Sequence, residues 1–264
     1  MSTYNLHYAS CRQAYPWNER MGLPNTSIYD LIVNTELFPE NDLVPSIASQ
    51  IKQKIDAMEG CFEDDHAIRL NEWHDIKEIA EYAQEVMPLI EREIFSCYLK
   101  VEFVHPYRNK KDGKEASSWL WHYDDCPQEF IKVFLYLNEV TPTNGCLEYI
   151  ENPSGLAPKI HTHRVAPTYT TGDQVYPQSR VPLSEIRKFL DEGLEIAQLT
   201  GPPGTTAVFT PNIVHRATIP ESGTTERDLI VFFLRPCLEK QNEYITENTH
   251  SYLPERNVKQ YELN

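Results

Sequence analysis

The residues of this chain best suited to metal chemistry are a histidine and an aspartate two positions apart, His122 and Asp124. An imidazole and a carboxylate with this spacing at a strand end can both turn toward one ion. A third ligand has to come from a distant segment, where His215 offers a second imidazole. Two histidines and one carboxylate leave several coordination positions open, which suits non-haem Fe(II) and dioxygen. The sequence therefore predicts an iron site whose three ligands come together only if the fold brings two distant segments side by side.

A candidate anion-binding residue, Arg227, follows His215 at the head of the apolar segment 227–234. A guanidinium grips a carboxylate through two charge-assisted hydrogen bonds. Burying this charged side chain in an apolar core without a bound anion would cost free energy. We therefore expect Arg227 to bind an anionic ligand near the metal. The alternative is a salt bridge at a sheet edge with Glu226 or Asp228.

Other histidines are weaker candidates as metal ligands. His161 and His163 form a His-x-His pair, but they lie in a proline-rich segment, and well-defined sites prefer rigid elements. His105 ends a predicted strand and is expected to line the site as a wall residue. Taken singly, His122 or His215 would be a satisfied polar or core histidine. The combination with the arginine favours a metal site.

The composition describes a chain of 264 residues that is 41% hydrophobic, enough to bury a sizeable core, and we expect one domain spanning 1–264. The net charge of −15 makes nucleic acid an unexpected partner and mildly favours a neutral or cationic substrate. No window approaches the roughly 18 apolar residues of a membrane span. The six cysteines form no Cys-x-x-Cys pair and the N-terminal residues lack a secretory pattern, so we expect reduced thiols and a cytoplasmic location.

The first part of the chain, about 1–97, is expected to be mainly helical. Segments 43–58 and 72–95 carry apolar residues at helical spacing, and Pro88 should kink or divide the second helix. Residues 1–40 show no dependable period and are expected to be irregular. The two helices should pack their apolar stripes against the core that follows.

From residue 98 the pattern changes to short runs rich in aromatic and β-branched residues, which favours strands. The predicted strands are 98–105, 118–123, 130–140, 146–150, 194–199, 205–210, 213–218 and 227–234. The turn signal Thr143-Asn-Gly145 predicts a hairpin that joins the third and fourth of them. Short strands separated by turns favour a sandwich or barrel of the jelly-roll type over about 98–236.

Three further segments accompany these strands. A helix is predicted over 183–191, and the polar tail 237–264 is expected to be peripheral. Between 151 and 180 no period is dependable. A segment this long in a compact domain is usually functional or disordered. Because it lies between the two halves of the predicted site, it is a candidate lid over the substrate.

The motif His122-x-Asp124, followed by His215 and Arg227, resembles the iron- and 2-oxoglutarate-dependent oxygenases, most closely the phytanoyl-CoA dioxygenase family. In that family a strand like 134–140, an Asn-Gly turn and a second strand come straight after the first two ligands. The resemblance covers the predicted jelly-roll core. It implies an α+β, mainly β fold: a double-stranded β-helix of the jelly-roll or cupin-like type, with the N-terminal helices packed against it.

The chain differs from the family pattern in the stretch 150–155 and matches it at Asp124. Ile150-Glu-Asn-Pro-Ser-Gly155 stands where the family usually has a Pro-Gly-Ser-His stretch, so a substrate role of that loop does not carry over. Asp124 is present, whereas halogenating relatives have a small residue there. The resemblance therefore implies a hydroxylase-type reaction.

The resemblance also implies roles. The ligands of Fe(II) would be His122, Asp124 and His215. Arg227 would bind the distal carboxylate of 2-oxoglutarate, helped by Tyr136 or, as an open alternative, by Lys132. Dioxygen would convert 2-oxoglutarate to succinate while a small organic substrate is oxidised. Two alternatives remain: a jelly-roll metalloenzyme that does not use 2-oxoglutarate, and a non-catalytic binding module of the same fold.

Overall fold

The fold is seen in a computed structural model that describes residues 3–15, 33–35, 38–64, 66–110, 117–124, 130–151, 169–171, 174–176, 180–211, 213–221 and 224–251. Its helices are α1 (Thr3–Ala14), α3 (Val44–Asp56), α4 (Lys77–Ile90), the π-helix η1 (Glu91–Phe95), the 3-10 helix η2 (Ser117–Trp119) and α5 (Leu183–Asp191). None of the described helices has the length and apolar character needed to cross a membrane.

The strands make up three sheets within the described residues. They are β1 (Val33–Asn34), β2 (Cys61–Glu63), β3 (Ala67–Leu70), β4 (Tyr98–Asn109), β5 (Ile131–Tyr136), β6 (Leu147–Glu151), β7 (Tyr169–Thr171), β8 (Gln174–Tyr176), β9 (Glu195–Leu199), β10 (Thr206–Phe209), β11 (His215–Ala217), β12 (Asp228–Cys237) and β13 (His250–Ser251). The large sheet has the order β1-β10-β5-β12-β4-β3-β2, with β13 beside β4. The small sheet has the order β11-β6-β9, and β7 pairs with β8. All pairings are antiparallel except that of β13 with β4.

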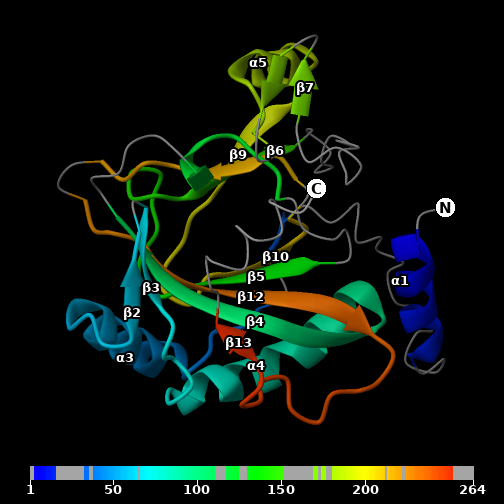
Figure 1. Cartoon of the computed structure of the whole chain (residues 1–264), viewed down its shortest axis with the longest axis vertical. Helices are drawn as coiled ribbons and strands as arrows, with labels where there is room; N and C mark the ends of the chain where they lie inside the picture. The colour runs from blue at the N-terminus through cyan, green and yellow to red at the C-terminus, as the bar shows by residue number, and fades with distance from the viewer. Residues whose placement is uncertain are drawn as a thin grey trace.

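The two faces of the large sheet have different neighbours. Ile131, Val133 and Leu135 of β5 belong to a core cluster that includes the apolar stripes of α3 and α4, which cover one face of the sheet (Figure 1). Side chains alternate along a strand, so Phe134 and Tyr136 point to the opposite face. There they pack with residues of β6 and β9 of the small sheet. We call this second face, which lies toward the small sheet, the inner face.

The predicted helices are present with small differences. α5 has the predicted bounds, and α3 lies within 43–58 and buries Val44, Ile47, Ile51 and Ile55. α4 runs through Pro88 without dividing, and η1 follows it directly. Pro88 lies in the last turn of α4, where a missing N–H removes only one hydrogen bond. The expectation that 1–40 is irregular is wrong for α1, which buries Cys11 against the core.

Two strand predictions are wrong. The segment 118–123 contains part of η2, followed by an extended stretch. In that stretch His122 makes isolated β-bridges, and no continuous ladder forms. The aromatic side chains are buried all the same, which is why their pattern resembled that of a strand. The predicted hairpin is absent: β5 lies in the large sheet and β6 in the small one, so the turn at Gly145 carries the chain between sheets. An Asn-Gly pair indicates that the chain reverses its direction, but it does not indicate which sheet the next strand joins.

The ends of the predicted core also differ from expectation. The tail after Cys237 is not peripheral throughout, because Tyr244 is buried in the core and β13 pairs with β4. Most of the candidate lid, 152–168, lies outside the described residues, as does the pair His161 and His163. The five cysteines in the described part of the chain carry free thiols.

Candidate metal centre

The two segments that carry the predicted ligands are joined by backbone hydrogen bonds. The N–H of His122 donates to the carbonyl of His215 at 2.9 Å, and the N–H of His215 donates to the carbonyl of His122 at 2.8 Å. The N–H of Asp124 donates to the carbonyl of Pro211 at 2.8 Å. His215 begins β11 of the small sheet. The short ladder therefore brings residues from two distant parts of the chain to one place.

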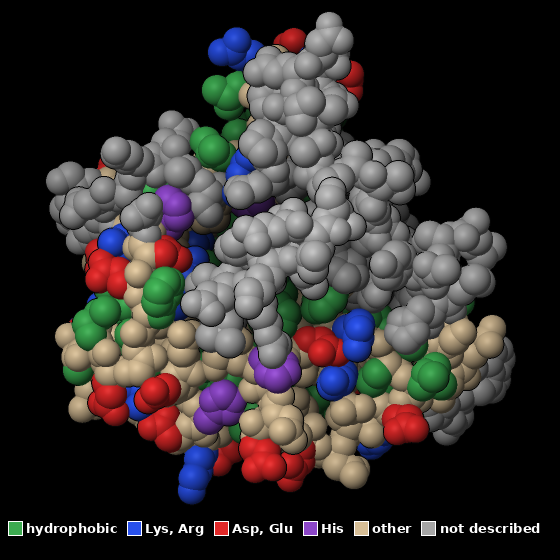
Figure 2. Space-filling model, viewed as in Figure 1, with side chains coloured by type: hydrophobic (Ala, Val, Ile, Leu, Met, Phe, Trp, Pro, Cys, Tyr) green, Lys and Arg blue, Asp and Glu red, His purple; other side chains and the backbone are tan. Residues whose placement is uncertain are grey.

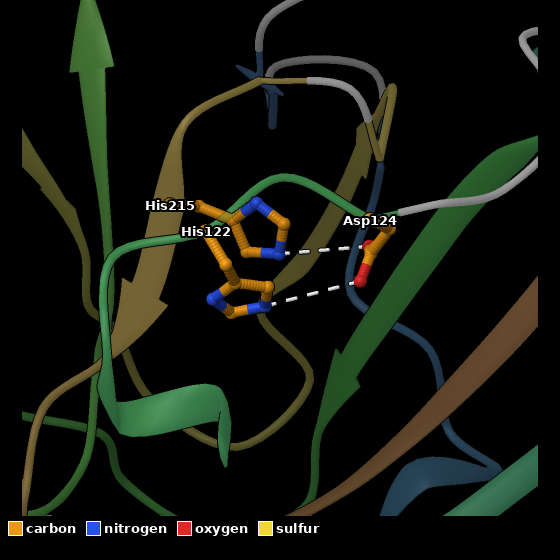
Figure 3. A group of neighbouring side chains, drawn as sticks. All are labelled: His122, Asp124 and His215. Carbon is orange, nitrogen blue, oxygen red and sulfur yellow. Dashed lines mark ion pairs between the residues drawn. The ribbon is translucent and has the colours of Figure 1, made fainter. Parts of the chain in front are cut away.

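His122, Asp124 and His215 form a compact group. One potential ligand atom from each lies within 4.8 Å of the others. The Nε2 atom of His122 is 3.8 Å from Oδ1 of Asp124, and Nε2 of His215 is 3.6 Å from Oδ2 (Figure 3). Figure 3 shows both imidazoles turned toward the same carboxylate. Two nitrogens and a carboxylate oxygen on one side of a shared space can bind a metal and leave its other side open.

Hydrogen bonds set the tautomer of both histidines. Nδ1 of His122 lies 2.7 Å from the carbonyl oxygen of Leu120, and Nδ1 of His215 lies 2.8 Å from that of Ile213. A carbonyl only accepts, so Nδ1 of each ring carries the proton. Burial lowers the pKa of both imidazoles, which keeps them neutral. The lone pairs are therefore on the two Nε2 atoms that face Asp124, as a metal site requires.

The carboxylate is held in its ionised form. Burial opposes ionisation, but Lys132 and the two histidines outweigh it and lower the pKa of Asp124. Lys132 forms an ion pair with Oδ2 of Asp124. Its ammonium also lies 5.0 Å from the centre of the Phe233 ring. A metal ion would therefore meet an ionised ligand without having to displace a proton.

Arg227 is buried on the inner face just before β12, with 1% of its surface exposed. Its Nε and Nη1 atoms have no hydrogen-bond partner in the described part of the chain. The predicted alternative, a salt bridge with Glu226 or Asp228, is not formed among the described residues; Asp228 instead binds Arg108 through both oxygens. A buried guanidinium with unsatisfied N–H groups is costly unless an anion occupies the space beside it.

The backbone of Arg227 is fixed by two asparagines that sequence analysis did not assign. The N–H of Asn109 donates to the carbonyl of Arg227 at 2.9 Å. The side chain of Asn138 donates to the carbonyl of Glu226 at 2.7 Å and accepts from the N–H of Asp228 at 2.8 Å. Asn109 lies directly opposite Arg227 across the β4–β12 ladder, so both side chains share a face. Its Nδ2 is also buried without a partner among the described residues.

The two predicted helpers occupy different places. The ring of Tyr136 lies 6.0 Å from the guanidinium of Arg227, but its hydroxyl donates to the carbonyl of Leu199 at 3.1 Å. Burial raises the pKa of Tyr136 to about 12, so the hydroxyl keeps its proton. The hydroxyl proton is therefore engaged by Leu199 in this structure, and the role of Tyr136 as a helper of Arg227 stays a prediction. Lys132 lies beside Asp124, at the other end of β5.

His105, which was expected to line the site, is buried and has an unpredicted partner. His105 faces the interior from β4, where Nη1 of Arg69 lies 2.7 Å from its Nε2. Arginine can only donate, so Nε2 of His105 accepts. Trp121 and Tyr123 pack with residues of α5 in a third core cluster. The pairing of β3 with β4, which places Arg69 beside His105, has no local sequence signal.

Comparison with solved structures places the chain in a known architecture. EctD from S. alaskensis, crystallised with 2-oxoglutarate and 5-hydroxyectoine, matches with a TM-score of 0.54 at 16% identity, over 84% of this chain and 78% of EctD. EctD with bound Fe gives a TM-score of 0.53 at 17% identity, over 80% and 76%. The non-haem α-ketoglutarate-dependent epimerase SnoN of nogalamycin biosynthesis gives 0.54 at 12% identity, over 94% and 98%.

These matches establish the fold. The chain has the mainly antiparallel β architecture, with a few helices, of these iron- and 2-oxoglutarate-binding proteins. No protein-family model matches the chain, and no curated protein matches its sequence. The resemblance to the phytanoyl-CoA dioxygenase family therefore stays a prediction.

Proposed function

We propose that this protein is a non-haem Fe(II)- and 2-oxoglutarate-dependent oxygenase that hydroxylates or otherwise oxidises a small organic substrate. The observation that carries the proposal is a pair of features: a two-histidine, one-carboxylate group next to the inner face, and a buried arginine with two N–H groups that have no partner among the described residues. A 2-oxo acid chelating the metal would reach Arg227 with its distal carboxylate. We further propose a single oxygenase domain over 1–264, built on a double-stranded β-helix.

The residues fit the metal and the co-substrate. His122, Asp124 and His215 would hold Fe(II) through two Nε2 lone pairs and an ionised carboxylate. When bound, Fe(II) supplies the chemistry with dioxygen that converts 2-oxoglutarate to succinate and oxidises the substrate. Nε and Nη1 of Arg227 would donate to the distal carboxylate, and Nδ2 of Asn109, which also has no partner among the described residues, is a further candidate donor.

Other features of the proposal follow from the sequence. Asp124 completes the ligand set, which favours a hydroxylase-type reaction. The expected cytoplasmic location and the absence of nucleic-acid and membrane partners stay predictions. The substrate would approach the open side of the metal, and the packed sheets around the site would limit access of water to the reacting groups.

The test is an anaerobic titration of the metal-free protein with Fe(II) and then 2-oxoglutarate, following the weak visible charge-transfer band of the chelate. We expect the band in the wild type and its loss in Arg227→Ala. Arg235→Ala is the matched control, because Arg235 lies on the same strand but is 43% exposed and pairs with Glu102. Iron uptake without the band would indicate a metalloenzyme that does not use 2-oxoglutarate. Absence of iron uptake would indicate a non-catalytic module.

A further inference from the structure

A row of side chains crosses four strands of the large sheet beside the metal centre. Phe209 of β10 is paired with Lys132 of β5, Lys132 with Phe233 of β12, and Phe233 with Phe103 of β4. Residues paired in this way project from the same face. Because Phe134 and Tyr136 of β5 lie on the inner face and alternate with its outer residues, Lys132 and the whole row lie there too. We call Phe209, Lys132, Phe233 and Phe103 the inner row.

The metal centre lies at one end of the inner row. The ring of His215 is 6.0 Å from that of Phe209, and Asp124 is ion-paired with Lys132. Tyr136, which contacts Arg227, is four residues further along β5, about 13 Å at the usual strand rise. A co-substrate reaching Arg227 would therefore run along β5. The part of the inner row toward β4, Phe233 and Phe103, lies away from that path on the other side of Lys132.

That part of the inner row is an aromatic wall. The rings of Phe103 and Phe233 are stacked, with centroids 4.0 Å apart and planes at 24°. Phe130 adds a third ring, 6.3 Å from Phe103. Phe103 and Phe130 are only partly buried, although they pack against the interior cluster. An accessible aromatic surface of this kind suits a flat, apolar part of a small molecule.

The wall carries positive charge, in contrast to the acidic outside of the protein. Figure 2 shows acidic side chains at several places on the outer surface, and the net charge is −15. Inside, Lys132 lies above Phe233 and Arg69 binds His105. Burial lowers the pKa of His105, and the cations of Arg69 and Lys132 lower it further. Each cation is also paired with a carboxylate, Arg69 with Asp64 and Lys132 with Asp124, so the wall carries two largely buried cationic groups within an acidic protein.

Metal binding would change the partner that Lys132 needs. The ammonium of Lys132 is paired with Asp124, and only 8% of the residue is exposed. A carboxylate that ligates Fe(II) shares its charge with the ion, so it neutralises a neighbouring ammonium less well. A buried ammonium is costly without an adequate counter-charge. A second anion beside the metal would restore the balance.

We propose that the primary substrate is an organic acid, whose apolar body lies on Phe103 and Phe233 and whose anionic group pairs with Lys132. This inference rests on the proposed function and assigns a substrate class to the same site. It reverses the expectation, based on net charge, of a neutral or cationic substrate. Lys132 is then a substrate-binding residue and not a second partner of 2-oxoglutarate.

The test compares two probes of the same shape and different charge, 3-phenylpropanoate and 3-phenylpropanamide. Binding to Mn(II)-loaded protein with 2-oxoglutarate is measured by calorimetry without oxygen, and relaxation of the probe protons by Mn(II) reports proximity to the metal. We expect the wild type to bind the acid about tenfold more tightly than the amide, the size of one charge-assisted contact. In Lys132→Met this preference should fall to under about twofold, and Lys132→Arg should keep most of it.

The matched control is Lys100→Met, which removes the same charge from an exposed lysine of β4. Equal binding of acid and amide to the wild type, no binding of either, or a preserved preference in Lys132→Met would each overturn the proposal. Loss of the Fe(II)–2-oxoglutarate band in Lys132→Met, with the preference intact, would assign the lysine to the co-substrate instead. Absence of that band in the wild type would contradict the proposed function, and calorimetry of the two probes without metal and 2-oxoglutarate would then test the acid preference separately.

Discussion

The two ends of the inner face differ in how their buried cations are satisfied. Arg227, at one end, has two N–H groups without partners in the described part of the chain. Lys132, at the other end, is ion-paired with Asp124. Both cations face the interior from neighbouring strands of one sheet. Among the described residues no anion pairs with the arginine end, where we propose that the co-substrate binds, whereas the lysine end holds a carboxylate that we propose as a metal ligand.

The two ends are also supported differently. Lys132 lies within β5, where ladders on both sides fix its backbone. Arg227 lies just before β12 begins, and the side chain of Asn138 bonds to the residues on either side of it. A residue outside a regular strand needs such bonds to hold its side chain in one direction. The arginine end is therefore more sensitive to changes in its surroundings.

The largest expected effect is that of Arg227→Ala on the co-substrate. Losing two buried charge-assisted hydrogen bonds should weaken 2-oxoglutarate binding by about 2–4 kcal/mol, or about 30- to 1,000-fold. The preference for 3-phenylpropanoate over its amide should not change, because it depends on Lys132 and not on Arg227. Calorimetry with both ligands measures this. Loss of both affinities together would show that the two ends are not independent.

A smaller effect is expected from Asn138→Ala. Two hydrogen bonds that fix the segment around Arg227 are lost, so 2-oxoglutarate affinity should fall about fivefold to tenfold, with stability lowered by about 1–2 kcal/mol. The probe preference at Lys132 should stay as in the wild type. Asn41→Ala is the control, because Asn41 also makes two side-chain hydrogen bonds, far from the site. An equal loss of affinity in the control would show a general effect of stability.

The sequence was sufficient to predict which side chains come together at the candidate metal centre, because ligand chemistry depends on residue type. Histidine and aspartate at 122 and 124 could be recognised from spacing, and the structure brings His215 to them. Their service as iron ligands stays a prediction. The position of Arg227 could be anticipated because a charge at the head of an apolar run is unusual. In both cases the signal was a polar or charged residue in an apolar segment, where its burial costs free energy.

The parts that could not be predicted depend on register and sheet membership. The aromatic residues of 118–123 indicated a strand, but they report burial, which a turn of 3-10 helix also provides. The turn at Gly145 did not show that β5 and β6 join different sheets. The inner row exists only because four strands align at Phe209, Lys132, Phe233 and Phe103. Such alignment over long sequence separations leaves no local pattern.

The burial of His105 near the two cations of the lysine end can be tested through its protonation. Its pKa lies below the usual 6.5 in the folded protein, so the unfolded chain gains a proton first as the pH falls. Stability should therefore decrease below about pH 6.5, by up to about 1.4 kcal/mol per pH unit from this residue alone. In His105→Gln, urea denaturation at pH 7.5 and 5.5 should show a smaller loss than in the wild type. The other buried histidines contribute equally to the wild type and to His105→Gln. Equal losses of stability in the two proteins between pH 7.5 and 5.5 would therefore show that His105 is charged in the folded protein.

The smallest effect is expected from Tyr136→Phe, which tests how the arginine end is built. The hydroxyl proton of Tyr136 is donated to Leu199, so the variant should lose about 1 kcal/mol of stability through the unpaired carbonyl. The affinity for 2-oxoglutarate should fall by less than about threefold, because Arg227 and Asn109 keep their N–H groups. A loss of about tenfold or more, measured by the same chelate titration, would mean that the hydroxyl turns from Leu199 to the carboxylate when the co-substrate binds. Tyr136 would then be a direct partner of the co-substrate, and the arginine end would rearrange on binding.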